Sequence, residues 1–313
     1  MHHYLFSTTQ SSYIIRYEEL VYSLLLLYLI FLRNAISPLQ FRNFSKELIT
    51  RSENPVILIP RFLYANRTFK KSGVIMKIVL AKVLEHKEAY ANLPLFQYMR
   101  DTSLSEEQRL SFYPCMAHFI LSFSDINKYM LRSEPASDEY QQRVNIHTYE
   151  DDHHWLWYLE DFAKLGFDNR CAPTKLMRFL WSDETHQNRI LTYRLAALIS
   201  TASAIERLAI IEAIEETGNV LFSIVVELAK AIELRHNIEL LYCGTFHFNL
   251  ESGHLVGSDR IDISEICLDG ATQARCLDLV DEVFSLFESW THELLSYAKG
   301  HPSAMQKDIP FPA

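Results

Sequence analysis

The chain has 313 residues, of which 49% are hydrophobic, so it can bury the core of one large domain or two smaller ones. Only eight glycines and ten prolines argue against an all-β chain with many turns and favour long helices. The formal net charge of −9 argues against nucleic acid as a partner.

The N-terminal quarter differs from the rest of the chain. Residues 1–75 carry nine Lys and Arg residues against four Glu, whereas the remainder is acidic. We expect a partly helical N-terminal extension over 1–75, followed by one helical domain over 76–313. Residues 21–32 form an apolar run shorter than the roughly 18–20 residues that a spanning helix needs. We expect this run to pack on the body or on a partner, with membrane contact as the minority alternative.

From residue 77 onward, apolar residues recur at helical spacing. Ser105 and Gln108 have the capping-box pattern that opens a helix, and this helix is expected to run to about residue 132. No segment predicts a strand, so a phosphate-binding βα unit is excluded. The sequence therefore predicts an all-α bundle of about seven or eight helices. The other helices are expected at 77–91, 95–100, 138–165, 175–181, 183–200, 204–234, around His247, and at 271–299.

The cysteines indicate the compartment. Their number is odd and none forms a Cys-x2-Cys pair, so they fit neither a zinc site nor a disulfide framework. We expect a reducing, cytoplasmic compartment in which they serve as small apolar residues. The five are Cys115, Cys171, Cys243, Cys267 and Cys276.

A cluster of acids and histidines lies in the expected helix 138–165, beside Trp155, Trp157 and Tyr158. So many aromatic residues predict burial, and buried ionisable groups need pairing or a metal. Glu150 and His153 form a Glu-x2-His pair. Glu150 and His154, four residues apart, are an equally feasible pair.

A second cluster reads His247-x3-Glu251-x2-His254. At about 100° per residue, these three side chains leave one face of a helix. Two imidazoles and a carboxylate are a ligand set for a transition metal such as iron. The alternative is a solvated polar face that holds these residues by coincidence.

A bundle-core metal site takes ligands from several facing helices. Glu212 and Glu216 lie four residues apart among apolar neighbours, and one of them is expected to supply a bridging carboxylate. Glu215 is expected to be solvated.

The order of these motifs resembles the haem-oxygenase-like di-iron oxidases and oxygenases. In that family a Glu-x2-His is followed about sixty residues on by a lone glutamate, and then by a His-x3-acid-x2-His. The alkene-forming fatty-acid decarboxylase also has a Trp seven residues after its first glutamate, which Trp157 matches. Its middle glutamate lies 35 residues before the next histidine, which selects Glu212 over Glu216. The resemblance covers residues 77–299.

The resemblance implies a haem-oxygenase-like fold, two Fe(2+) ions per chain, O2 as co-substrate, an external reductant, and a small organic substrate of hydrophobic or amphiphilic character. The acidic last helix permits a homodimer. Iron versus manganese stays open. The implied ligands are Glu150, His153, Glu212, His247, Glu251 and His254.

Two departures from the family pattern leave alternatives open. The family more often has Asp where Glu251 stands. The spacing His147-x3-Asp151-x2-His154 also imitates the last motif. The rival functions are a metal-free enzyme or small-molecule-binding protein like thiaminase II, and an interaction or membrane-associated protein that works through residues 21–32.

Overall fold

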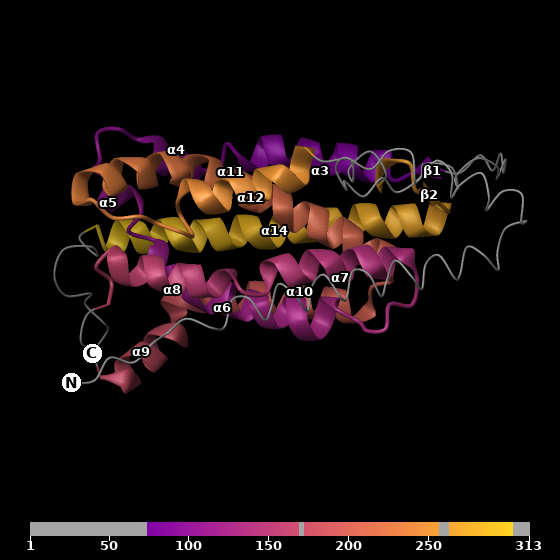
Figure 1. Ribbon diagram of the computed structural model, residues 1–313, viewed down its shortest axis with the longest axis horizontal. Coiled ribbons are helices and arrows are strands. Elements are labelled where there is room, and N and C mark those ends of the chain that lie inside the picture. The colour runs from indigo at the N-terminus through magenta and orange to yellow at the C-terminus, as the bar shows by residue number, and fades with distance from the viewer. Residues whose placement is uncertain (1–73, 169–171, 257–262, 303–313) are drawn as a thin grey trace, which may run out of the picture. The chain divides into compact units, whose positions relative to one another are not determined.

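The computed structural model describes residues 74–168, 172–256 and 263–302, but not the side chains of Val74 and residues 251–256. The described part is an all-α bundle, which confirms the predicted class (Figure 1). The predicted extension over 1–75 lies almost wholly outside the described residues, as does the apolar run 21–32, so the domain division stays a prediction. Among the described helices, none combines the length and apolar character needed to cross a membrane.

The helices follow one another in this order along the chain. They are α3 Lys77–Tyr90, α4 Pro94–Arg100, α5 Glu106–Arg109, α6 Ala117–Ile126, α7 Glu139–Asp151, α8 His154–Lys164, α9 Pro173–Leu180, α10 His186–Thr201, α11 Ala204–His236, α12 Thr245–Val256 and α14 Gly270–Gly300. Short 3-10 turns at Tyr113–Met116 and Asp183–Thr185 and a π-helical turn at Asn127–Leu131 connect some of them. Within the described residues, β1 Val74–Ile75 pairs antiparallel with β2 Cys267–Leu268.

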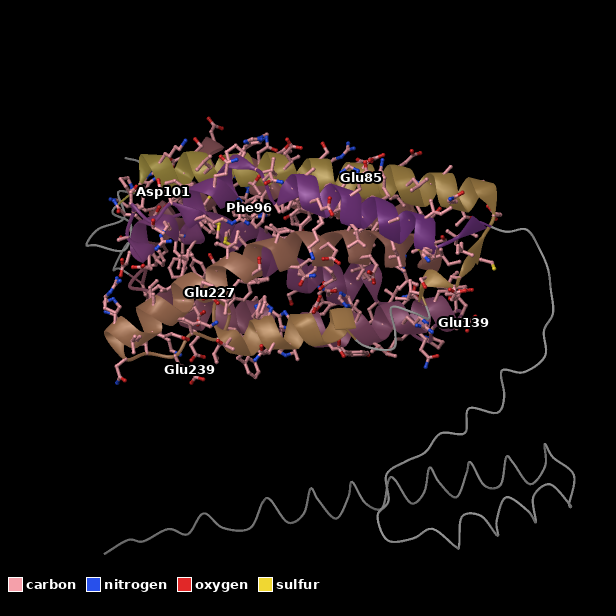
Figure 2. The ribbon with its side chains drawn as sticks, turned by 90° about the horizontal axis from the view of Figure 1, so that it is seen from above. Glu85, Phe96, Asp101, Glu139, Glu227 and Glu239 are labelled. Atoms are coloured by element: carbon pink, nitrogen blue, oxygen red, sulfur yellow. The ribbon has the colours of Figure 1, made fainter. Side chains whose placement is uncertain are left out.

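The core is built along α11 and α14, which pack against each other and against α3 and α10 (Figure 1). α11 begins with a capping box between Ser203 and Glu206 and ends at Asn237, whose φ of 52° is a left-handed cap. Its neighbours cover it on most sides, so apolar residues are buried around most of its circumference. Figure 2 shows exposed glutamates on several elements, such as Glu85, Glu139 and Glu227, and the buried Phe96 of α4.

The predicted long helix 105–132 is interrupted, and proline explains the interruption. The capping box of Ser105 and Gln108 is present, but α5 ends at Arg109. Pro114 cannot donate a backbone hydrogen bond, and its ring clashes with the preceding turn of an α-helix. The chain therefore passes through a 3-10 turn before α6 begins at Ala117.

The predicted helix 138–165 is also broken, between α7 and α8 at Asp152 and His153. Ser124 of α6 donates a hydrogen bond of 2.6 Å to the Asp152 carbonyl. Arg132 donates to the Thr148 carbonyl at 2.8 Å and to the Asp152 carboxylate at 2.6 Å. These tertiary hydrogen bonds use groups near the end of α7 and hold the break in place.

An ion pair between a partly exposed lysine and a fully buried glutamate joins α3 to α11 and provides a test of the packing. The Lys87 ammonium lies 2.7 Å from the Glu216 carboxylate, and the Glu216 side chain is 0% exposed. We predict that Lys87→Met lowers the free energy of unfolding by about 2–3 kcal/mol, because a buried carboxylate then loses its counter-charge. Urea denaturation measures the change.

A matched control lies on the same helix. Lys82 pairs with the half-exposed Asp281, so Lys82→Met is expected to cost less than about 1 kcal/mol. Adding Glu216→Leu to Lys87→Met should restore most of the lost stability. Equal losses for the two lysine variants would contradict the structural role of the Lys87–Glu216 pair.

Candidate metal centre

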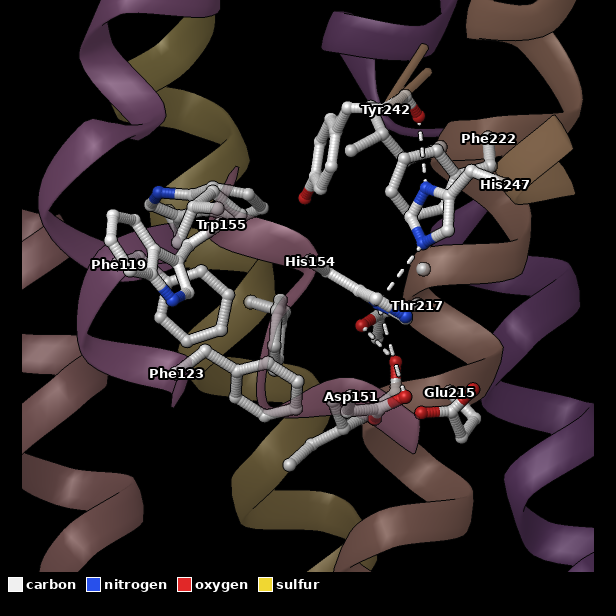
Figure 3. A pocket seen from close by; sticks show the side chains of 16 residues that line it. Phe119, Phe123, Asp151, His154, Trp155, Glu215, Thr217, Phe222, Tyr242 and His247 are labelled. Carbon is white, nitrogen blue, oxygen red and sulfur yellow. Dashed lines mark hydrogen bonds and ion pairs between the residues drawn. The ribbon is translucent and has the colours of Figure 1, made fainter. Parts of the chain in front are cut away.

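A small cavity of about 80 Å³ lies among α6, α7, α8, α11, α12 and α14. Aromatic side chains line one side of it and ionisable side chains line the other (Figure 3). The ionisable residues of the lining are Asp151, His154, Glu215 and His247. A third histidine, His147 of α7, contacts Asp151 and Glu215 of this set.

The break between α7 and α8 decides which side chains face the cavity. Asp151 ends α7 and His154 begins α8, and both are buried. The Nδ1 atom of His154 lies 3.9 Å from Oδ1 of Asp151. His153, in the break itself, has a side chain that is 45% exposed and lies near Asp152 instead. Of the two histidines that the sequence left open, His154 is the one that lines the cavity.

Three side chains converge next to the cavity. Nε2 of His147 lies 3.0 Å from Oδ2 of Asp151 and 3.4 Å from Oε1 of Glu215. One donor atom from each residue falls within 4.8 Å of the other two. Burial alone would lower the pKa of His147, but the carboxylates of Asp151 and Glu215 outweigh burial and raise that pKa well above its ordinary value. Oδ1 of Asp151 is buried and accepts no hydrogen bond from the described residues.

His247 of α12 reaches the cavity from the opposite side and is 2% exposed. Its Nδ1 atom lies 2.9 Å from the carbonyl oxygen of Tyr242, which can only accept a hydrogen bond. Nδ1 therefore carries the proton, and the lone pair of Nε2 faces His154, whose Nδ1 lies 3.2 Å away. A backbone carbonyl that orients an imidazole in this way is the usual support of a metal-binding histidine.

Asp161 of α8 holds the turn that carries the Tyr242 carbonyl. Its two carboxylate oxygens accept hydrogen bonds from the backbone N–H groups of Leu241, at 2.7 Å, and Cys243, at 2.8 Å. Burial raises the pKa of Asp161 to about 6, against the lowering effect of these hydrogen bonds. Asp161 thus positions His247 through the turn without touching the cavity.

The residues fit a metal by their chemistry. Imidazole nitrogens and carboxylate oxygens form a mixed donor set that suits iron or manganese. Two nitrogens bonded at about 2.0–2.1 Å to one metal lie roughly 3 Å apart. The spacing between His154 and His247 is compatible with that arrangement.

Of the six ligands predicted from the sequence, only some lie at the cavity in the described part of the chain. His247 lines the cavity, whereas Glu150, His153 and Glu212 are partly exposed and are not part of its lining. The side chains of Glu251 and His254 lie outside the described residues. The geometry therefore brings His154 into the site in place of His153, and Glu215 in place of Glu212.

Most of the cavity residues that are missing from the six predicted ligands belong to a pattern that the sequence does show. His147, Asp151 and His154 are the residues of the alternative spacing noted above. Glu215 was expected to be solvated, and the structure corrects this, because its side chain is only 14% exposed and lines the cavity. α11 is buried around most of its circumference, so helical periodicity did not separate an inner face from an outer one.

Comparisons with known proteins support the fold alone. No family model matches the sequence, and no curated protein matches it. Among solved structures, the chain is similar to a domain of unknown function with a haem oxygenase-like fold from Shewanella denitrificans OS217. The TM-score is 0.52 at 14% sequence identity, and the match covers 77% of this chain and 98% of that domain. The chain thus has a haem-oxygenase-like fold.

The raised pKa of Asp161 gives a prediction on pH. The folded chain holds this proton more tightly than the unfolded chain, whose pKa is near 3.8, so unfolding releases protons between about pH 4 and 6. The stability that Asp161 contributes is therefore largest below pH 4 and falls as pH rises, by up to about 3 kcal/mol. Asp161→Asn should remove this dependence. Urea denaturation of both proteins at pH 4 to 7 measures it, and parallel pH profiles would contradict the assignment.

Proposed function

We propose that this protein is a non-haem di-iron oxidase or oxygenase that uses O2 on a small organic substrate. The observation that carries the proposal is the convergence of His147, Asp151 and Glu215 beside a cavity that His154 and His247 also enter. The haem-oxygenase-like fold is compatible with such an enzyme.

The proposed ligands come from both sides of the cavity. His147, Asp151 and Glu215 would hold metal on the side of α7 and α11, and His154 and His247 on the side of α8 and α12. By their spacing, Glu251 and His254 share a helix face with His247 and would complete the set. Bound iron(II) would supply the electrons that reduce O2, and an external reductant would restore them.

The protein's own residues would prepare this chemistry. Trp157 stacks on His154 with a centroid distance of 4.5 Å, and Phe222 packs edge-on against His247 at 4.4 Å. These rings exclude water from the imidazoles and fix their orientation. Oδ1 of Asp151 would then take a cation, and Nε2 of His247 would exchange its contact with His154 for a bond to the metal.

Iron loading tests the proposal. After anaerobic incubation with Fe(II) and removal of unbound metal, we expect about two equivalents of iron per chain and an O2-dependent absorption change. Parallel loading with Mn(II) decides between the two metals. Less than one equivalent of either metal would sink the proposal and favour a metal-free enzyme or binding protein.

Residues close to the proposed ligands in the chain provide matched control variants for the ligand assignment. We expect Asp151→Asn, His154→Gln and Glu215→Gln each to weaken iron binding by roughly tenfold or more, because each removes a proposed ligand, which costs at least as much as the loss of an outer partner. Glu150→Gln, His153→Gln and Glu212→Gln should bind iron as the parent chain does. Equilibrium dialysis against Fe(II) measures all six. The reverse pattern would restore the ligand set predicted from the sequence.

A further inference from the structure

The short helix α9 presents large apolar side chains to solvent. At about 100° per residue, Leu176, Met177 and Trp181 lie within roughly 140° of one another on this helix and its last turn. These residues are 43%, 62% and 63% exposed. A single exposed apolar side chain is ordinary, whereas several on one face mark an interaction surface. Phe179 of the same helix is buried and attaches α9 to the core.

The bundle holds α9 in this exposed position by its C-terminal end. The Thr185 hydroxyl donates a hydrogen bond of 2.9 Å to the Phe179 carbonyl. Arg189 of α10 donates to the Leu180 carbonyl at 2.8 Å and to the Ser182 carbonyl at 3.0 Å. In Figure 1, α9 projects from the bundle. The apolar face of α9 is therefore anchored by specific hydrogen bonds while it stays open.

The apolar face continues onto the neighbouring helices through aromatic rings. Trp181 packs edge-on against His118 of α6 with ring centroids 5.7 Å apart, and His118 packs edge-on against the exposed Tyr193 of α10 at 6.2 Å. Trp and Tyr are enriched at membrane–water interfaces, because each combines an apolar ring with a polar N–H or O–H group.

The charge of α9 is opposite in sign to that of the chain. Residues 172–182 contain Lys175 and Arg178, both exposed, and no acidic residue, whereas the whole chain has a net charge of −9. The acids that follow are Asp183 and Glu184, and Glu184 lies 3.7 Å from Nε2 of His301. Protein interfaces are depleted of lysine. Apolar side chains with Lys and Arg and without acids are instead typical of a helix that lies on an anionic bilayer.

We propose that α9 docks this protein on the surface of an anionic lipid bilayer. Leu176, Met177 and Trp181 enter the headgroup region, and Lys175 and Arg178 lie near lipid phosphates. Docking is peripheral and reversible by salt, since one helix of eight residues supplies it. The docking surface is independent of the oxidase function proposed above, because none of these five residues lines the cavity.

Co-sedimentation of the full chain with vesicles tests the proposal. We expect binding to vesicles of equal parts phosphatidylglycerol and phosphatidylcholine, and roughly tenfold weaker binding to phosphatidylcholine alone. The apolar double variant Leu176→Gln with Met177→Gln should bind the mixed vesicles roughly tenfold more weakly. The charge double variant Lys175→Gln with Arg178→Gln should lose the preference for the anionic lipid. Gln is a good helix former and these positions are exposed, so both should keep the circular dichroism of the parent.

Two leucines of α8 provide a matched control. Leu156 and Leu159 are also exposed, at 51% and 41%, but Glu160 follows them. Leu156→Gln with Leu159→Gln should bind the mixed vesicles as the parent does. Parental binding by the apolar variant of α9, or an equal loss in the α8 control, would overturn the proposal. So would a chain that binds no vesicles and forms a dimer that the apolar variant dissociates, since a second copy would then cover α9.

Trp181 reports directly on contact with lipid. Bromine-labelled lipids quench an indole that enters the bilayer, and the other tryptophans, Trp155, Trp157 and Trp290, are partly or fully buried. We expect the parent to be quenched, and Trp181→Phe to bind vesicles normally but lose most of the quenching. Quenching that persists in Trp181→Phe, or binding without quenching in the parent, would assign the contact to another part of the chain and contradict the role of α9.

Discussion

The site depends on the break between α7 and α8. Ser124 and Arg132 hold the backbone and the side chain of Asp152 from outside the helix, and α7 stops at Asp151. On a continuous helix, His147, Asp151 and His154 would share one face, because residues three and four apart are neighbours on a helix surface. With the break, Asp151 and His154 both line the cavity, and His154 also contacts His247 of α12, whereas the side chain of His153 is 45% exposed.

Contacts elsewhere in the bundle orient His247 and Glu215 toward Asp151 and His154. The carboxylate of Asp161 accepts hydrogen bonds from the backbone of the turn at 241–243. The carbonyl of Tyr242 in this turn accepts a hydrogen bond from Nδ1 of His247 and so sets its tautomer. On α11, Glu216 pairs with Lys87 of α3, whereas the neighbouring Glu215 faces His147 of α7. Each support uses a hydrogen bond or ion pair that is itself buried or partly buried, where such contacts are strongest.

Helical periodicity was sufficient to predict the fold class and most of the helices, because most of them bury an apolar face that recurs at helical spacing in the sequence. The interruption at Pro114 was also readable in principle, since proline cannot continue a helix. The break at Asp152 was not readable, because Ser124 and Arg132 cause it from 20 or more residues away. Glu215 was missed for a different reason: a helix covered on most sides has no periodic pattern that separates a ligand from a solvated acid.

The two histidine motifs show how one spacing can serve two geometries. On the continuous helix α12, the residues of His247-x3-Glu251-x2-His254 share one face by helical rotation alone. In His147-x3-Asp151-x2-His154 the break between α7 and α8 falls before the last residue. Helical rotation therefore no longer fixes the direction of His154 relative to His147 and Asp151. His147 and Asp151 turn to Glu215 of α11, whereas His154 turns to His247 of α12. One short stretch of chain thus reaches two neighbouring helices, which a continuous helix with the same residues would not do.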